Sequence, residues 1–155
     1  LHLIETDVTE LTESVIANIR TAHRKAKIST SDLDGKPVQK LVWKIDDAAI
    51  KQVLTNIINN AYVFAGEKPI EVQLGTKDNQ LLIEVVDHGE GIPKQLRAKI
   101  FERFYRSDNS RNRDTGGSGL GLAIAKGLIE KHGGTIVADV TNGGGATFRI
   151  SIPNK

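Results

Sequence analysis

The sequence predicts an α+β fold, a two-layer sandwich in which helices lie on one face of a mixed β-sheet. Two observations support this prediction. Amphipathic helical patterns are interspersed with pairs of short strand-like segments, the order expected for antiparallel hairpins between helices. The chain also has 155 residues, with 39% hydrophobic and 26% charged side chains, which is ordinary for one globular domain with a core.

The N-terminal third of the chain predicts one helix and two strands. Residues 3–22 carry apolar side chains at helical spacing, with Asp7 or Thr9 as the candidate N-cap. Residues 27–33 form a short mixed segment that is typical of an edge strand. Residues 38–45 alternate between the two faces, which predicts a half-buried strand.

A second helix and a β-hairpin are predicted next. The helix follows Asp46 or Asp47 as N-cap and continues to about Ala65. Residues 70–76 and 81–86 both alternate and are joined by a short polar turn, so we expect a hairpin. The core stripe of the helix comprises Ile50, Val53, Leu54, Ile57, Ile58 and Ala61.

The remaining elements are a loop, a helix and a second hairpin. Residues 87–92 form a loop with two glycines, and residues 106–118 are so poor in apolar side chains that they predict a mobile surface loop. A helical pattern over 120–132 stops at a pair of glycines. Strand patterns over 135–140 and 146–152 then complete the sheet.

Composition limits the possible partners. The net charge of +2 is too small to favour nucleic acid or a membrane surface as a partner. The chain contains no cysteine, so a disulfide framework and a thiolate metal site are excluded. No apolar run approaches the roughly 20 residues of a membrane span. Because the chain begins at Leu1 in mid-pattern, we expect it to be a fragment of a longer protein.

A glycine-rich run precedes the last helix. Residues 116–122 contain four glycines in their first six positions, and a helical pattern follows at once. Free backbone N–H groups and the positive end of the helix dipole make such a helix start an anion site. A glycine-rich turn before an ordinary helix is the plain alternative, since glycine loops are weak motifs by themselves.

Two asparagines stand out in the second helix. Asn56 and Asn60 are four residues apart, so their amides lie on one face of the helix, one turn apart. Asparagine is a poor residue for a helix interior, and its amide oxygen suits Mg²⁺. Simple exposure of both side chains to solvent is the alternative.

Asp87 ends a strand rich in isoleucine and valine. A carboxylate there is costly to bury unless it has a donor as partner, and the 6-amino group of adenine is such a donor. Guanine carries a carbonyl at that position and would be rejected. Gly89 and Gly91 let a base approach the backbone. A strand-ending turn is the alternative, and His88 is expected to be exposed and without a role.

Four stretches together resemble the ATP-binding catalytic domain of bacterial sensor histidine kinases, within the GHKL ATPase superfamily. The asparagine box is residues 56–61 and the first glycine box is residues 87–92. The phenylalanine box is residues 100–106 and the second glycine box is residues 117–122. The order and spacing of the four boxes match the family over nearly the whole chain, which is far more specific than any one box.

The resemblance implies a role for each matching residue. Asn60 would hold Mg²⁺ with Asn56 beside it, Asp87 would bind the adenine amine, and Arg106 would meet the terminal phosphate. The same asparagines and Arg106 would be the catalytic residues, residues 106–118 would form an ATP lid, and a five-stranded sheet would lie under three helices. The residues implied to bind the nucleotide are Asn56, Asn60, Phe64, Asp87, Gly89, Gly91, Ile92, Tyr105, Arg106, Gly117, Gly119, Leu120, Gly121 and Leu122.

The resemblance also implies an activity and partners. The chain would be a single catalytic domain, residues 1–155, that binds Mg·ATP and donates the γ-phosphate to a histidine on a separate dimerisation hairpin domain, for relay to a response regulator. None of the four histidines lies in the family's acceptor motif, so the domain would be inactive alone. The parent protein would be anchored in the membrane with this domain in the cytoplasm.

Two positions depart from the family pattern. Val63 stands where a phosphate-contacting Lys or Arg is common, and Ala146 stands where Ser or Thr is usual, while Thr147 is expected to face the other side of its strand. We therefore expect weak ATP affinity. A serine kinase of the anti-sigma-factor type and a degenerate, non-catalytic binding module remain alternatives; the ATPases of gyrase, mismatch repair and the heat-shock chaperone fit less well.

Overall fold

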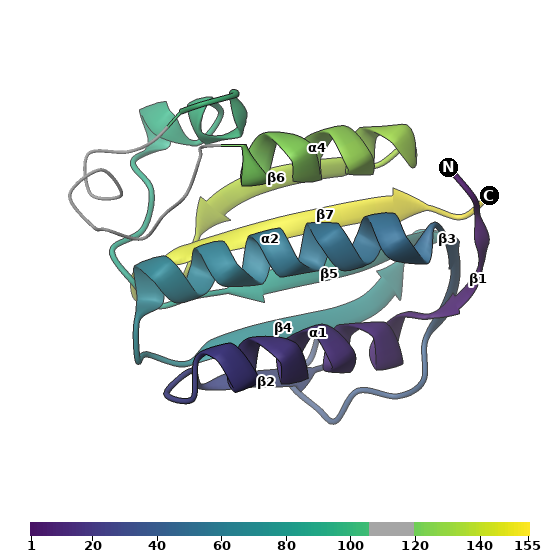
Figure 1. Cartoon of the computed structure of the whole chain (residues 1–155), viewed down its shortest axis with the longest axis horizontal. Coiled ribbons are helices and arrows are strands. Elements are labelled where there is room, and N and C mark those ends of the chain that lie inside the picture. Colours follow the sequence, from purple (N-terminus) through teal and green to yellow (C-terminus); the bar gives the residue numbers. More distant parts are fainter. Residues whose placement is uncertain (106–119) are drawn as a thin grey trace.

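A computed structural model of the chain describes residues 1–105 and 120–155, and it has the predicted two layers (Figure 1). Three α-helices of the described residues lie on one face of a five-stranded sheet. The helices are α1 (Val8–Ala22), α2 (Asp47–Ala65) and α4 (Gly121–Lys131). In spatial order, the strands are β2 (Ile28–Ser31), β4 (Ile70–Lys77), β5 (Gln80–Val86), β7 (Ala146–Pro153) and β6 (Thr135–Val140). The α+β prediction is therefore confirmed.

The sheet is mixed, as predicted. Edge strand β2 runs parallel to β4, and every other neighbouring pair is antiparallel. The β4–β5 hairpin turns at Asp78 and Asn79, whose φ angles of 53° and 60° are both positive. Positive φ at both central residues matches the right-handed twist of the flanking strands, and Asp and Asn tolerate it better than most residues.

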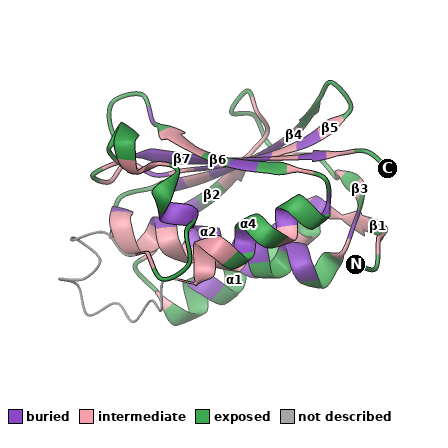
Figure 2. Cartoon of the chain, turned by 90° about the horizontal axis from the view of Figure 1, so that it is seen from above, coloured by how far each residue is buried: buried purple, intermediate pink, exposed green. Residues whose placement is uncertain are grey.

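The core lies between the helices and the sheet, where Figure 2 shows buried segments facing one another. Helix α2 occupies the centre of the helical layer, and its predicted stripe is buried throughout. Along β5 and most of β7, buried positions alternate with half-buried ones, and the helices cover only the face that carries the buried positions (Figure 2). Fully buried large side chains in this core include Ile16, Ile50, Leu54, Ile57, Ile58, Leu74, Ile83, Phe148 and Ile150.

The N-terminal region differs from the prediction. Residues Ile4–Asp7 form a strand, β1, and only Val42–Ile45 of the predicted strand over 38–45 is extended, as β3. The two pair antiparallel in a small separate sheet. Asp7, at the end of β1, is the N-cap of α1 and accepts a hydrogen bond from the Glu10 N–H at 3.0 Å. The candidate N-cap Asp7 is confirmed, whereas the first five residues of the predicted range 3–22 lie outside the helix, because the strand that pairs with β1 is distant in sequence.

Short elements after Pro93 connect the first glycine box to the phenylalanine box. They are two 3₁₀ turns, η1 (Lys94–Leu96) and η2 (Lys99–Phe101). Within residues 1–105 and 120–155, no helix has the length and hydropathy needed to cross a bilayer.

Candidate functional site

Helix α2 presents three predicted site residues along one side. Asn56, Asn60 and Phe64 follow one another at four-residue spacing, and each is half-buried. The Asn56 Nδ2 donates a hydrogen bond to the Gly121 carbonyl at 3.1 Å, although the two residues are 65 positions apart. Because a carbonyl only accepts, this bond orients the amide and leaves its oxygen as a ligand for a cation.

The carboxylate of Asp87 lies at the end of β5 and is only 1% exposed. Its Oδ1 accepts the backbone N–H of Gly89 and the backbone N–H of Ala146, both at 3.0 Å. Hydrogen bonds from N–H groups to an ionised carboxylate are strong and offset the cost of burying it. Both donors that the described residues supply bind Oδ1. The other oxygen, Oδ2, is therefore the one suited to accept a hydrogen bond from an incoming amine.

Two glycines allow the segments around Asp87 to meet. A Cβ on Gly89 would lie 2.5 Å from the Phe64 carbonyl oxygen at the end of α2. A Cβ on Gly145 would lie 2.1 Å from the Asp87 carbonyl oxygen, and Gly145 also has a φ of +110°. Side chains at either position would therefore collide with backbone. Gly89 has a packing reason to be glycine in addition to the predicted approach of a base.

Two threonine hydroxyls interact across the β6–β7 turn, the turn whose Gly145 contacts Asp87. Thr141 and Thr147 are both buried, and their Oγ1 atoms are 2.9 Å apart. The Thr141 N–H also donates to the Gly145 carbonyl at 3.1 Å, which shapes the turn that contacts Asp87. Thr147 faces away from the core residue Phe148, as the alternation predicts. The sequence does not predict this pair, because Thr141 and Thr147 meet only once the β6–β7 turn has formed.

The remaining predicted site residues fall into two groups, those that the structure describes and those among residues 106–119, which it does not describe. Ile92, Tyr105 and Leu122 are half-buried and pack against the core. Gly91 has a φ of +79°, and Leu120 and Gly121 begin α4. Arg106, Gly117, Gly119 and the predicted lid over 106–118 lie outside the described residues.

The structure thus brings the asparagine box, the first glycine box and the start of α4 together. The C-terminal half of α2 and the first turn of α4 lie at the same end of the molecule (Figure 1). The first glycine box joins them through the contact between Gly89 and Phe64. Helices α2 and α4, whose residues Asn56 and Gly121 are 65 positions apart in sequence, therefore form one polar, glycine-lined region.

Two histidines have structural roles. His132 is buried, its Nδ1 donates to the Leu128 carbonyl at 2.8 Å, and its Nε2 accepts the Asp46 N–H at 3.1 Å. Both ring nitrogens are thereby used by the fold. His88 is half-buried rather than exposed as expected, and its Nε2 lies 3.0 Å from the Glu71 carboxylate.

The family model described as "Histidine kinase-, DNA gyrase B-, and HSP90-like ATPase" matches residues 45–155. The chain belongs to this family. The match includes α2, the Asp87 loop and the start of α4, which are the segments that the fold brings together.

Relatives narrow the position of the chain within the ATPase family. Sensor histidine kinase WalK of Bacillus subtilis (strain 168) is 43% identical over 122 residues, which are 77% of this chain and 20% of WalK. The chain therefore spans about a fifth of this relative's length. Because the relatives are named as sensor histidine kinases, the ATPase domain described here is of the histidine-kinase kind.

Solved structures of histidine kinases are also similar to this chain. The catalytic domain of the histidine kinase ThkA has a TM-score of 0.84 and 26% identity, covering 99% of this chain and 97% of that domain. ThkA has also been solved in complex with the response regulator protein TrrA, with a TM-score of 0.80, 25% identity and coverage of 99% of this chain and 42% of that chain. Full-length ShkA in complex with AMPPNP has a TM-score of 0.83 and 28% identity, covering 99% of this chain and 31% of ShkA.

Proposed function

We propose that this chain is the catalytic domain of a sensor histidine kinase, a single domain spanning residues 1–155, which binds Mg·ATP and donates the γ-phosphate to a histidine on a separate dimerisation hairpin domain. The observation that carries the proposal is the Asp87 carboxylate, which is buried, hydrogen-bonded through Oδ1, and adjacent to the glycines of its loop. An ionised carboxylate at a predicted base site selects a donor such as the adenine amine.

The phosphates and the metal would lie along α2 and the start of α4. Asn60 would hold Mg²⁺, and the oriented amide of Asn56 would lie beside it. When bound, Mg²⁺ would neutralise charge on the phosphates. The backbone N–H groups at the start of α4, with Gly117, Gly119, Leu120, Gly121 and Leu122, would contact the phosphates, and Arg106 would meet the terminal one.

The acceptor would come from outside this chain. Phosphoryl transfer needs the donor and acceptor to be positioned, with residues 106–118 as the lid over the nucleotide. His132 uses both ring nitrogens in the fold, which supports an acceptor on another domain and an inactive isolated chain. The complex of ThkA with its response regulator supports relay to such a protein. The parent protein would be anchored in the membrane, with this domain in the cytoplasm.

A trans-phosphorylation assay tests the proposal. The chain would be mixed with γ-labelled ATP, Mg²⁺ and a separate histidine-bearing hairpin domain, and the labelled product would be exposed to acid. We expect label on the hairpin that is lost in acid, because phosphohistidine is acid-labile. Label that survives acid would favour the serine-kinase alternative. ATP binding without transfer to any acceptor would favour a degenerate binding module, for which Val63 and Ala146 are the motivating residues.

A further inference from the structure

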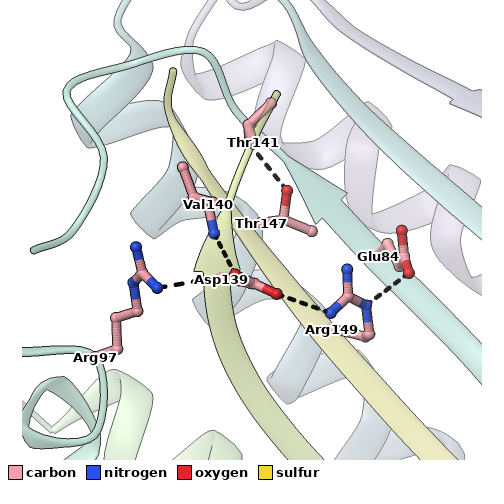
Figure 3. Close-up of polar contacts among 7 residues, drawn as sticks. All are labelled: Glu84, Arg97, Asp139, Val140, Thr141, Thr147 and Arg149. Carbon is pink, nitrogen blue, oxygen red and sulfur yellow. Dashed lines mark hydrogen bonds and ion pairs between the residues drawn. The ribbon is translucent and has the colours of Figure 1, made fainter. Parts of the chain in front are cut away.

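A line of charged side chains crosses the face of the sheet that the helices leave uncovered. The Arg149 Nε on β7 donates to Glu84 Oε1 on β5 at 2.8 Å, and its Nη1 donates to Asp139 Oδ2 on β6 at 3.3 Å (Figure 3). Asp139 Oδ1 lies 3.9 Å from the Nη1 of Arg97, which follows η1. The four charges alternate in sign and connect three strands to the segment after the first glycine box.

Arg97 joins this line to the loop of the candidate site. Its Nε donates to the Ile92 carbonyl at 3.1 Å, while its Nη1 faces Asp139. The guanidinium is planar and presents its donors in a fixed fork, so one side chain can hold two acceptors in a defined arrangement. Arg97 therefore links the C-terminal end of the loop 87–92 to β6, by a hydrogen bond to Ile92 and an ion pair with Asp139.

The Asp139 carboxylate that faces Arg97 is itself held by two hydrogen bonds. Its Oδ1 also accepts the Val140 N–H at 2.7 Å. The Val140 N–H, followed by the Arg149 guanidinium, lowers the pKa of the Asp139 carboxyl, so this group stays charged at neutral pH. Groups on β6 and β7 thus hold the Asp139 carboxylate in place independently of Arg97.

The two ends of the loop are held differently. Its first residue, Asp87, is held by the Ala146 N–H on β7 and by the Gly89 N–H. Its last residue, Ile92, is held through its carbonyl by Arg97. Ile92 is also half-buried and packed against the core, where the resemblance places it at the base.

We propose that Arg97 and Asp139 are positioning residues for the adenine site, with Arg97 acting through the Ile92 carbonyl and Asp139 acting through Arg97. This inference rests on the proposed function, in which the loop 87–92 receives the base. Neither residue needs to touch the nucleotide. Their role is to keep the loop in the conformation in which Asp87 and Ile92, at its two ends, are held in place.

Calorimetric titration of the 155-residue chain with ADP tests the inference. We expect Arg97→Ala to raise the Kd for ADP about fivefold, since it removes a hydrogen bond from a charged group in a partly exposed setting. Asp139→Asn should raise the Kd about twofold, and should have no further effect in the Arg97→Ala background. Arg97→Lys should not restore affinity, because an ammonium cannot hold both acceptors in the same fork.

The matched control is Lys94→Ala, which removes a cation from the neighbouring η1 turn. A second readout is hydrogen exchange of the backbone amides of residues 88–92, which should become faster in Arg97→Ala but not in Lys94→Ala, while exchange in β1 and β3 is unchanged. The nucleotide-free unfolding midpoint of each variant reports its global fold. If Arg97→Ala lowers that midpoint, the Kd of Asp139→Asn for ADP decides whether the pair positions the loop, because this substitution is nearly isosteric.

The outcomes separate this inference from the proposed function. If the unchanged chain does not bind ADP, the proposed function fails and the inference falls with it. If the unchanged chain binds ADP but Arg97→Ala and Asp139→Asn both match Lys94→Ala, the positioning role alone is overturned. Restoration of full affinity by Arg97→Lys would likewise overturn it, because charge without the fork would then be sufficient.

Discussion

The two ends of helix α2 each adjoin an aspartate that accepts two backbone N–H groups, but the carboxylates use them differently. At the N-terminal end, Asp46 accepts the Ala49 N–H on Oδ1 at 3.0 Å and the His2 N–H on Oδ2 at 2.9 Å. Beside the C-terminal end, Asp87 accepts both of its described N–H partners on Oδ1. Asp46 therefore uses both oxygens to hold the fold, whereas Asp87 is held from one side.

The surroundings of the two carboxylates differ in the same way. His132 packs against the Asp46 end and accepts the Asp46 N–H, so protein groups complete that end. The Asp87 end instead has Gly89 and Gly145 in close contact with backbone. The comparison teaches that a carboxylate held by backbone N–H groups indicates a ligand site when these hydrogen bonds leave one of its oxygens for a ligand.

The largest expected effect is on the glycine that contacts Asp87. Gly145→Ala would place a Cβ 2.1 Å from the Asp87 carbonyl oxygen at a φ of +110°, so we expect about 3 kcal/mol or more of lost stability. Denaturant unfolding measures this loss. The matched control is Gly143→Ala, which has a φ of +86° but no heavy atom within 4 Å. Equal losses for the two variants would show that the contact with Asp87 contributes nothing.

A smaller effect is expected at the structural aspartate. Asp46→Ala removes the N-cap of α2 and should lower the thermal unfolding midpoint by a few degrees, with ADP affinity unchanged at temperatures where the domain is folded. Asp47→Ala is the neighbouring control. A large loss of ADP affinity in Asp46→Ala would break the division between the two ends of the helix.

The contribution of Asp46 should also depend on pH. The His2 N–H, followed by the Ala49 N–H, lowers the pKa of Asp46 below its ordinary value of about 3.9. A lowered folded-state pKa stabilises the fold above that pH, and the stabilisation is lost as pH falls through the folded-state value. We therefore expect the difference in unfolding midpoint between the unchanged chain and Asp46→Ala to be constant from about pH 5 to 7 and to shrink below about pH 4. A difference that grows on acidification would contradict this.

The smallest expected effect concerns a missing cation at the nucleotide end. Val63 is half-buried on α2, between Asn60 and Phe64 in sequence. Val63→Lys should tighten ATP binding a few-fold, because a partly screened charge pair with phosphate is worth about 1 kcal/mol. Val63→Gln controls for size and polarity. Equal ATP affinities for the lysine and glutamine variants would mean that position 63 does not face the phosphates.

Sequence patterns predicted the features that depend on local periodicity, namely the span of a helix and the face on which a side chain lies. The apolar stripe of α2 predicted its span and placed Asn56 and Asn60 on one side, and the alternation of β7 predicted that Thr147 lies on the face opposite to Phe148, but not that Thr147 is buried. The strand β1 was missed because its partner β3 is distant in sequence. The Thr141–Thr147 pair and the Arg97–Ile92 bond were missed because both depend on how strands and loops meet in three dimensions. The roles of Arg106, Gly117 and Gly119 stay predictions.

The most direct measurement is calorimetric titration of the chain with ATP and with GTP, with and without Mg²⁺, repeated for Asp87→Asn and for Asp46→Asn. The substitution at Asp87 is nearly isosteric and can keep the Oδ1 bonds, but it turns Oδ2 into a donor that opposes the adenine amine. We predict binding of ATP but not GTP, strengthened by Mg²⁺, retained in Asp46→Asn, and lost in Asp87→Asn. Unchanged ATP affinity in Asp87→Asn, or equal affinity of the unchanged chain for ATP and GTP, would contradict the assignment of Asp87 as the adenine-binding carboxylate.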